Sequence, residues 1–389
     1  MRDSKAMKIL PTAAAGLIAV VIGFVSSVAI LFQAATAAGA TPAQTSSWIF
    51  AVCLGSGLVS IGFSLYYKTP VLGAWSTPGA ALLSASLLNV PMSETVGAFM
   101  FAGLLTIIAG ATGWFEKAVK RIPVPLASAM LAGILLKFGL DVFTSIKAEP
   151  MIVLAMLVTY FIAKQFIPRY AVVCVLLIGT VISGFLGKLH FEAVGFTFAE
   201  PVFVMPSFSW NILIGVGIPL FVVTMASQNL PGVVVMRSAG YHPPLSPIIT
   251  GMGFATFLLA PFGAFSVNLA AITAAIVSGP EANKDPSQRY IAAVSAGVVY
   301  LVVALMSSAI IALLSVFPKE MILALGGIAL FVTIANGMLL AVKEDRSREA
   351  AVITFLVTAS GVSLMGIGAA FWGLVAGVIA MIATKPKLA

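Results

Sequence analysis

Charged side chains are scarce in this chain. Among 389 residues there are 21 Lys and Arg and 13 Asp and Glu, so only 9% are charged while 60% are apolar. Soluble domains carry about 25% charged residues, and a globule of this length cannot cover its surface with so few. The composition therefore excludes a soluble enzyme, a nucleic-acid-binding protein and a disordered scaffold, and it predicts a protein embedded in a membrane.

Cysteine and histidine are almost absent from the sequence. Cys53 and Cys174 lie in apolar runs, and His190 and His242 lie at the ends of such runs, without a CxxC motif or a Cys/His cluster. We interpret the cysteines as buried, inert thiols. The sequence predicts no metal or redox site, no tightly bound cofactor and no covalent chemistry.

Apolar segments of about 18–25 residues are the length of membrane-spanning helices, and the sequence contains fourteen, some short or interrupted. The first follows a basic start and runs on without a convincing cleavage site, so we interpret it as a span rather than a signal peptide. The predicted fold is an all-α integral membrane protein. The segments are residues 11–36, 46–67, 71–90, 93–114, 122–141, 149–166, 170–188, 209–236, 244–261, 264–279, 289–315, 318–341, 350–367 and 369–384.

The distribution of basic residues tests this count. If both termini and the loops after even-numbered segments share one side, that side holds all of the 21 basic residues except Lys137, Lys147, Lys188 and Lys319. Positive charge concentrates in cytoplasmic loops. We therefore predict a multi-pass protein of a bacterial inner membrane with both termini in the cytoplasm.

An internal repeat divides the chain. Residues 73–76 (Gly-Ala-Trp-Ser) match residues 263–266 (Gly-Ala-Phe-Ser) at an offset of 190, while residues from 122 match those from 317 at an offset near 195. Seven segments per copy is an odd number, so the second copy enters the membrane from the opposite side. This predicts a 7+7 inverted repeat (9–188 and 209–385, with a linker at 189–208), which is typical of secondary transporters.

Segments 3 and 10 are predicted to be broken, each with extended backbone followed by a half-helix. Ser76 or Thr77 can cap a helix whose first position is Pro78, and Ser266 can cap a second helix that begins at Val267. The inverted repeat would bring the two N-termini together near the midplane, where each carries roughly half a positive charge. The pair would suit an anion, and a carboxylate in particular.

Polar and aromatic residues beside these helix starts are further candidates for binding. Mid-span amides and hydroxyls are costly without partners, so they either contact the substrate or hold helices together; Asn268 could face the site or the packing surface. Aromatic residues before the half-helices could hold a flat ring or simply pack. The candidates are Ser227, Gln228, Trp75, Phe265 and Asn268, with Phe24, Ser26, Ser27, Gln33 and Asn229 as weaker ones.

Acidic residues are missing from the middle of every predicted span. All thirteen map to loops, termini or helix ends, and neither histidine is mid-span. Proton-driven carriers usually hold a titratable group inside the membrane. We therefore hypothesise that a coupling proton travels on or beside the substrate carboxylate, with Glu94 as the nearest alternative.

Residues 69–83 (TPVLGAWSTPGAALL) and 219–232 (PLFVVTMASQNLPG) make the chain similar to bacterial benzoate/proton symporters of the BenE type, as do 262–276 and 355–374. The resemblance covers essentially the whole chain. It implies secondary active uptake of benzoate or a similar aromatic carboxylate, with protons and membrane lipid as the other partners.

The same resemblance links the chain to nucleobase/ascorbate and sulfate-type carriers. It implies a core domain (11–114 and 209–315), a gate domain (122–188 and 318–384) and, by analogy, a homodimer. Nucleobase carriers place a Glu where we align Ser227 and another where we align Phe265 or Ser266. Because this chain has neither Glu, the departure favours an anionic substrate over a nucleobase.

Three alternatives stay open at this point. A carrier of another small organic anion or of a nucleobase-like ring would have the same fold. An anion channel would share the broken-helix repeat but could not accumulate substrate uphill. An intramembrane enzyme would need a nucleophile–base pair or metal ligands at depth, and the sequence offers no mid-span Asp, Glu or His for either.

Overall fold

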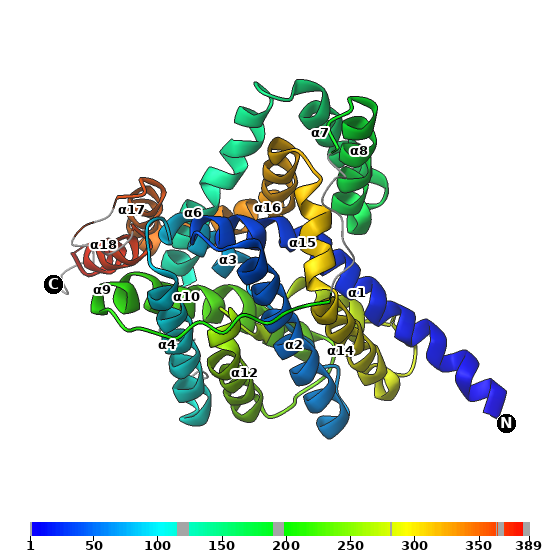
Figure 1. Cartoon of the computed structure of the whole chain (residues 1–389). Helices are drawn as coiled ribbons and strands as arrows, with labels where there is room; N and C mark the ends of the chain where they lie inside the picture. Colours follow the sequence, from blue (N-terminus) through cyan, green and yellow to red (C-terminus); the bar gives the residue numbers. More distant parts are fainter. Residues whose placement is uncertain are drawn as a thin grey trace.

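The computed structural model describes residues 2–114, 124–189, 198–280, 282–362, 364 and 369–383. Within these residues the chain is mostly helical (Figure 1). Eight helices are long and apolar enough to cross a membrane, and three further apolar helices are shorter. The protein is therefore an integral membrane protein, as the composition predicted.

The helices follow the predicted segments closely. They are α1 (Arg2–Ala37), α2 (Pro42–Tyr67), α3 (Thr77–Ser86), α4 (Met92–Ala111), α6 (Val124–Ser145), α7 (Pro150–Phe166), α8 (Ala171–Phe185), α9 (Trp210–Ile212), α10 (Ile218–Thr224), α11 (Leu230–Ser238), α12 (Leu245–Leu259), α13 (Ile272–Ser278), α14 (Tyr290–Leu305), α15 (Ser307–Ser315), α16 (Lys319–Val342), α17 (Arg348–Ala359) and α18 (Ala369–Ala383).

Segment 8 is a single spanning helix, in which π-helical turns at Leu213–Gly217 and Met225–Asn229 join α9, α10 and α11. Two other segments differ from their predicted extent. Segment 11 is interrupted at Met306, between α14 and α15. Segment 13 ends as α17 at Ala359 rather than at 367, and part of the remainder lies outside the described residues.

Local sequence explains where the helices near the site begin. Thr41 and Gln44 form a capping box ahead of α2, with Pro42 at its first position. At α3 the Ser76 hydroxyl accepts a hydrogen bond from the Gly79 N–H (2.9 Å). The predicted cap at Ser76 is thus confirmed.

Two short, largely buried strands pair with each other. β1 (Gly73–Ala74) pairs antiparallel with β2 (Asn268–Leu269), Gly73 opposite Leu269 and Ala74 opposite Asn268. A hydroxyl group on a neighbouring helix also accepts a backbone hydrogen bond at each strand. The Ser60 hydroxyl of α2 accepts from the Gly73 N–H (2.8 Å), and the Thr256 hydroxyl of α12 accepts from the Val267 N–H (2.8 Å).

The strand pair corrects the predicted register between segments 3 and 10. Symmetric pairing makes residues 73 and 74 equivalent to 268 and 269, an offset of 195 rather than 190. The starts of α3 and α13, at residues 77 and 272, have the same offset. The match between residues 73–76 and 263–266 is therefore a coincidence of composition, five residues out of register.

This shift overturns two further predictions. Ser266 caps no helix, because α13 begins at Ile272, with Ala271 before it and no side-chain cap. Asn268 lies in β2 and not in the helix that was predicted to begin at Val267. The helix of segment 10 thus begins five residues later than the sequence suggested.

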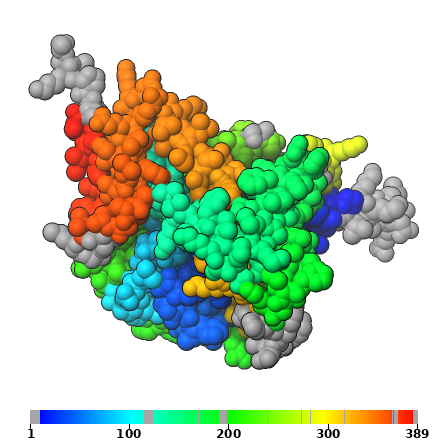
Figure 2. Space-filling view, turned by 90° about the horizontal axis from the view of Figure 1, so that it is seen from above, coloured from blue at the N-terminus to red at the C-terminus, as the bar shows by residue number. Residues whose placement is uncertain are grey.

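Helices from the two halves of the chain interleave. α2 packs on α14, α4 on α12 and α6 on α16, and α1 lies against α3, α13 and α14. Residues 198–208 run as an extended segment across these helices (Figure 1). The Ser47 hydroxyl binds the Val202 N–H (2.9 Å), and the Ser207 N–H donates to the Ser93 carbonyl (2.9 Å). Seen from above, α6–α8 and the orange and red α16–α18 lie together on one face (Figure 2).

Candidate functional site

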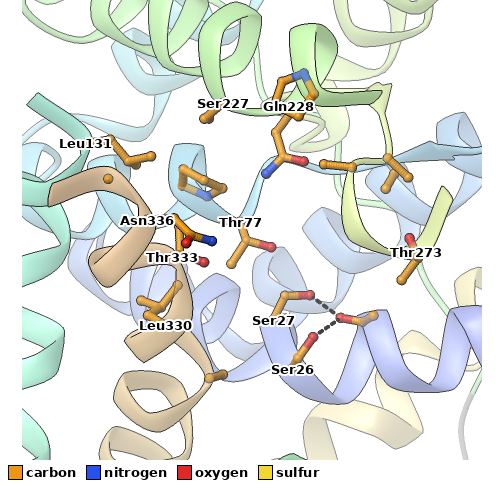
Figure 3. A pocket seen from close by; sticks show the side chains of 18 of the residues that line it. Ser26, Ser27, Thr77, Leu131, Ser227, Gln228, Thr273, Leu330, Thr333 and Asn336 are labelled. Atoms are coloured by element: carbon orange, nitrogen blue, oxygen red, sulfur yellow. Dashed lines mark hydrogen bonds between the residues drawn. The ribbon is translucent and has the colours of Figure 1, made fainter. Parts of the chain in front are cut away.

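A cavity of about 490 Å³ lies where the strand pair meets the surrounding helices. Its size falls in the range of roughly 300–1,000 Å³ that is typical of small-molecule sites. Figure 3 shows the side chains that face it. The lining residues are Ile22, Gly23, Ser26 and Ser27 of α1, Ala74, Trp75, Thr77 and Pro78 around the start of α3, Ala127, Ser128 and Leu131 of α6, Ala226, Ser227, Gln228 and Pro231 of segment 8, Ala270, Ala271 and Thr273 around the start of α13, Tyr300, and Ala329, Leu330, Thr333, Asn336, Gly337, Leu339 and Leu340 of α16.

The start of α3 forms one wall of the cavity. Thr77 and Pro78 open the helix and line the cavity, while Ser76 is fully buried behind them and caps the Gly79 N–H. The first N–H groups of a helix have no intrahelical partner, and they carry the positive end of the dipole. Since Pro78 has no N–H and Ser76 caps that of Gly79, this wall offers the N–H and hydroxyl of Thr77 and a partial positive charge, without a basic side chain.

The start of α13 contributes different residues from those predicted. Ala270, Ala271 and Thr273 line the cavity, whereas Phe265, Ser266, Val267 and Asn268 do not. The Phe265 ring is fully buried, and its centroid lies 6.0 Å from that of Phe99 and 6.4 Å from that of Trp48. The five-residue error in register explains all four misplacements.

Three of the predicted polar residues hold the strands instead. Asn229 accepts the Leu269 N–H at its side-chain oxygen (2.9 Å). The amide orientation of Asn268 that satisfies its neighbours accepts the Ser76 N–H (3.0 Å) and the Ser266 hydroxyl (2.9 Å). Ser266 also lies 3.3 Å from the Thr224 hydroxyl. All of these side chains are buried, so they fix the strand pair behind the cavity wall.

The hydrogen bond from the Leu269 N–H to Asn229 leads to a prediction about stability. Asn229→Ala leaves the buried Leu269 N–H unpaired, which should lower the free energy of unfolding by about 1–3 kcal/mol. The measurement is the thermal unfolding midpoint of the purified protein in detergent. Thr36→Ala, at an exposed hydroxyl that bonds only within its own helix, should leave the midpoint unchanged. Equal midpoints for the two variants would contradict the structural role.

Segment 8 presents three consecutive residues to the cavity. Ala226, Ser227 and Gln228 lie in the π-helical turn, and all three line the wall. π-Turns widen a helix locally and are frequent at functional sites. Ser227 donates to the Val223 carbonyl (2.6 Å), which leaves its oxygen free to accept. The two predicted polar candidates here, Ser227 and Gln228, are thus in the cavity.

α1 supplies hydroxyls to the wall opposite segment 8. Ser26 and Ser27 line the cavity, and both donate to the Gly23 carbonyl (2.9 and 2.6 Å; Figure 3). Phe24 and Gln33 do not line it. Phe24 instead packs edge-on against Trp75, with ring centroids 5.5 Å apart.

Only a small part of the Trp75 side chain is exposed to the cavity. It is 4% exposed, with Phe24 on one side and Tyr300 on another, where the centroids are 5.9 Å apart. Its indole N–H is buried and has no hydrogen-bond partner among the described residues. Trp75 therefore shapes the cavity floor by packing rather than offering an open face to a ring.

Sequence reasoning missed the polar residues of α6 and α16. Ser128, Thr333 and Asn336 all line the cavity, and Figure 3 shows Thr333 and Asn336 close to Thr77. The signal was available, because Asn336 is an amide inside an apolar span.

The cavity wall carries no formal charge in the described part of the chain. It contains hydroxyls, two amides and helix starts, but no Asp, Glu, His, Lys or Arg. The described acidic and basic side chains lie elsewhere; in the loop before α14, for example, hydrogen bonds from Ser287 hold the pKa of Asp285 below its usual range. Such a wall can bind an anion by hydrogen bonds and dipoles, and it lacks the acid–base pair that catalysis would need.

Comparison with known proteins gives one family over nearly the whole chain. Residues 6–383 match the family described as benzoate membrane transport protein. The chain is 46% identical to the inner membrane protein YdcO of Escherichia coli over 367 residues, which are 94% of each chain. It is 38% identical to the benzoate membrane transport protein of Acinetobacter baylyi over 374 residues, 96% of this chain and 95% of the other.

Solved structures share the fold at low sequence identity. The transmembrane domain of the cyanobacterial bicarbonate transporter BicA superimposes with a TM-score of 0.64 at 17% identity, covering 94% of this chain and 97% of that one. The structure of SLC26A9 gives a TM-score of 0.65 at 13% identity, covering 97% and 65%. With its apolar helices and with relatives named for membrane transport, the chain is a multi-pass transport protein and not an enzyme. It belongs to the benzoate membrane transport protein family.

Proposed function

We propose that this protein carries benzoate or a similar aromatic carboxylate into a bacterial cell, together with a proton, by alternating access. The observation that carries the proposal is the uncharged cavity at the start of α3, which combines the N–H and hydroxyl of Thr77 with further hydroxyls and two amides. The A. baylyi relative is named for benzoate, and the E. coli relative for the inner membrane. Both names agree with an inner-membrane carboxylate carrier.

In the proposed complex the carboxylate lies against the first turn of α3. Thr77 offers its hydroxyl and its N–H, and Ser227 and Gln228 complete the polar side from segment 8. The apolar lining of Ile22, Leu131 and the alanines at the start of α13 would surround the ring. Burying a ring against apolar side chains contributes roughly 25 cal/mol per Å², which would compensate for the absence of a basic residue.

The proposed architecture is fourteen spans in a 7+7 inverted repeat, with core and gate domains as predicted. Support comes from contacts that repeat under the exchange of halves. α2 packs on α14 as α12 packs on α4, and α7 packs on α8 as α17 packs on α18. The two strands are related by the same exchange. A homodimer, predicted by analogy, stays a prediction.

The state of this structure is proposed to be inward-facing. Cavity residues lie near the start of α6, at Ala127 and Ser128, and run to the end of α16, where Leu339 and Leu340 are exposed. The basic residues predict that this end of the molecule, like both termini, is cytoplasmic. The cavity would thus open toward the cytoplasm.

Proton coupling is proposed to proceed through the substrate itself. Among the described residues no carboxyl group or histidine lines the cavity. Glu94, the predicted alternative, lies half-buried in the first turn of α4. We expect Glu94→Gln to keep the dependence of uptake on the pH gradient, with less than a twofold change. Loss of that dependence with binding intact would make Glu94 the proton carrier.

The deciding experiment is uptake of labelled benzoate into proteoliposomes, with and without an inward proton gradient. Vesicles without protein serve as the control, because neutral benzoic acid crosses bilayers unaided. Saturable, protein-dependent accumulation above the external concentration is expected. Protein-dependent flux that only equilibrates would indicate a channel, and no protein-dependent flux would refute benzoate as the substrate.

A further inference from the structure

The hydroxyl groups that line the cavity differ in what they can offer a ligand. Ser26 and Ser27 both donate to the Gly23 carbonyl (2.9 and 2.6 Å), and Ser227 donates to the Val223 carbonyl (2.6 Å). An ionised carboxylate accepts hydrogen bonds and donates none. With their protons already used, these three serines offer it only lone pairs, so its donors must come from other side chains.

Two side chains of α16 carry donors that have no partner in the described part of the chain. Thr333 and Asn336 both line the cavity, and neither side chain makes a hydrogen bond to another described residue. A threonine inside a helix often donates to the carbonyl four residues earlier, as Thr180 of α8 does to Leu176 (2.8 Å). Thr333 makes no such bond, so its hydroxyl proton and the Asn336 amide protons are available to a ligand.

The packing of α16 against α6 brings these two side chains to the cavity. Gly337, the residue after Asn336, lies so close to α6 that a Cβ there would be 3.3 Å from the Ser128 carbonyl oxygen. Thr333 and Asn336 are three residues apart, so they share one face of the helix beside this contact. In Figure 3 both lie next to Thr77, which offers an N–H and a hydroxyl from the start of α3.

Donors from two helices therefore meet on one side of a cavity whose described wall carries no charge. We propose that the substrate carboxylate is bound between α3 and α16, with Thr77 donating to one of its oxygens and Thr333 and Asn336 donating to the other. Gln228 then supplies a further donor from segment 8. The inference rests on the proposed carrier function and deepens it, because it adds α16 to the helices that bind the substrate.

This placement gives the carboxylate a role in the transport cycle. α3 belongs to the predicted core domain and α16 to the predicted gate domain, so a carboxylate bound to both holds the two domains together. A ligand favours the conformation to which it binds more tightly, and here its contacts span the boundary between the domains. The substrate must then break its hydrogen bonds to α16 before the core domain can carry it away from the gate domain.

Equilibrium binding of labelled benzoate to the purified protein in detergent tests the two ligands on α16. Asn336→Leu keeps a similar volume and removes the donors, so the dissociation constant should rise about tenfold, the loss of one hydrogen bond to a charged group. Thr333→Val keeps the shape and removes the hydroxyl, and we expect a rise of about threefold or more. Thr180→Val removes a hydroxyl that lies outside the cavity and bonds within its own helix, and it should leave binding unchanged.

Two further measurements separate a ligand from a residue that only supports the fold. Benzamide has the ring of benzoate without its charge, so Asn336→Leu should lower the ratio of benzoate affinity to benzamide affinity, whereas a general distortion would weaken both equally. Asn336→Asp has nearly the same shape and places a second carboxylate beside that of the substrate. At neutral pH it should therefore weaken benzoate binding more than Asn336→Leu does.

Benzoate affinities equal to that of the wild type for both Asn336→Leu and Thr333→Val would overturn the inference and leave the proposed function standing. If the wild type binds no benzoate, the proposed substrate is wrong, and the same variants are compared with other labelled aromatic carboxylates. One that binds equally well to the wild type and to both variants would again overturn the placement on α16, whereas weaker binding to the variants would support it. Binding of no aromatic carboxylate at all would refute the carrier function and this inference together.

Discussion

Ser227→Glu should abolish most of the benzoate binding. Ser227 lies in the wall of a cavity that has no charged side chain among the described residues, so a new carboxylate there would face the substrate carboxylate without compensation. Two unit charges about 5 Å apart at an effective dielectric constant of about 20 repel by about 3 kcal/mol. This corresponds to a loss of affinity on the order of 100-fold. Equilibrium binding of labelled benzoate to the purified protein measures it.

The control for size is Ser227→Gln, which adds a similar volume but no charge. The ratio of the affinities of the two variants isolates repulsion, and its pH dependence has a definite sign. The new carboxyl group is charged above its pKa, so the Glu variant should lose affinity relative to the Gln variant as the pH rises. A ratio near one at every pH would move the carboxylate away from segment 8.

The start of α3 could be predicted from sequence because short-range chemistry determines it. A Ser followed by Thr-Pro-Gly specifies a helix start, and the structure places the cap at Ser76. The start of α13 has no such signal. Its N-terminal residues are alanines without a side-chain cap, and the nearest Ser lies in extended backbone. Composition alone then supported a register that the strand pairing shows to be wrong by five residues.

The remaining differences have a similar origin. Asn229 and Asn268 were candidates because amides inside a span need partners, and they do have partners, but these belong to the strands. Sequence identifies such residues without showing which way they point. The π-helical turn that brings Ser227 and Gln228 into one wall is a tertiary feature, with no periodicity to reveal it. Asn336 carries the same sequence signal, an amide inside an apolar span, but only the packing of α16 against α6 shows that it faces the cavity.

Gly232→Ala should cost most of the transport activity although the substitution adds a single methyl group. Gly232 is where α11 crosses β2, and a Cβ there would lie 2.7 Å from the Ala270 carbonyl oxygen and 2.7 Å from the Leu269 Cβ. Leu269 belongs to β2 and Ala270 follows it directly. The Leu269 N–H donates to Asn229, and in the paired strand the Gly73 N–H donates to Ser60, so this backbone is held in place. The methyl group can be accommodated only if β2 or α11 moves.

That movement would be transmitted directly to the site. Ala270 and Ala271 line the cavity immediately after β2, so a shift of the strand displaces the start of α13 relative to α3. Overpacking lowers the free energy of unfolding by about 1–3 kcal/mol. The higher helix propensity of Ala offsets up to about 1 kcal/mol of this loss. We therefore expect a modest fall in the unfolding midpoint and at least a tenfold fall in the benzoate uptake rate.

Gly62→Ala is the matched control for this prediction. Gly62 also lies inside a helix, α2, but a Cβ there would meet nothing within 4 Å. The same substitution should then leave uptake unchanged and raise the unfolding midpoint slightly, because Ala favours the helix. Uptake by Gly232→Ala at the rate of Gly62→Ala would show that the crossing of α11 and β2 tolerates a methyl group. In that case the position of α13 would not depend on this contact, and the site would be less rigid than its close packing implies.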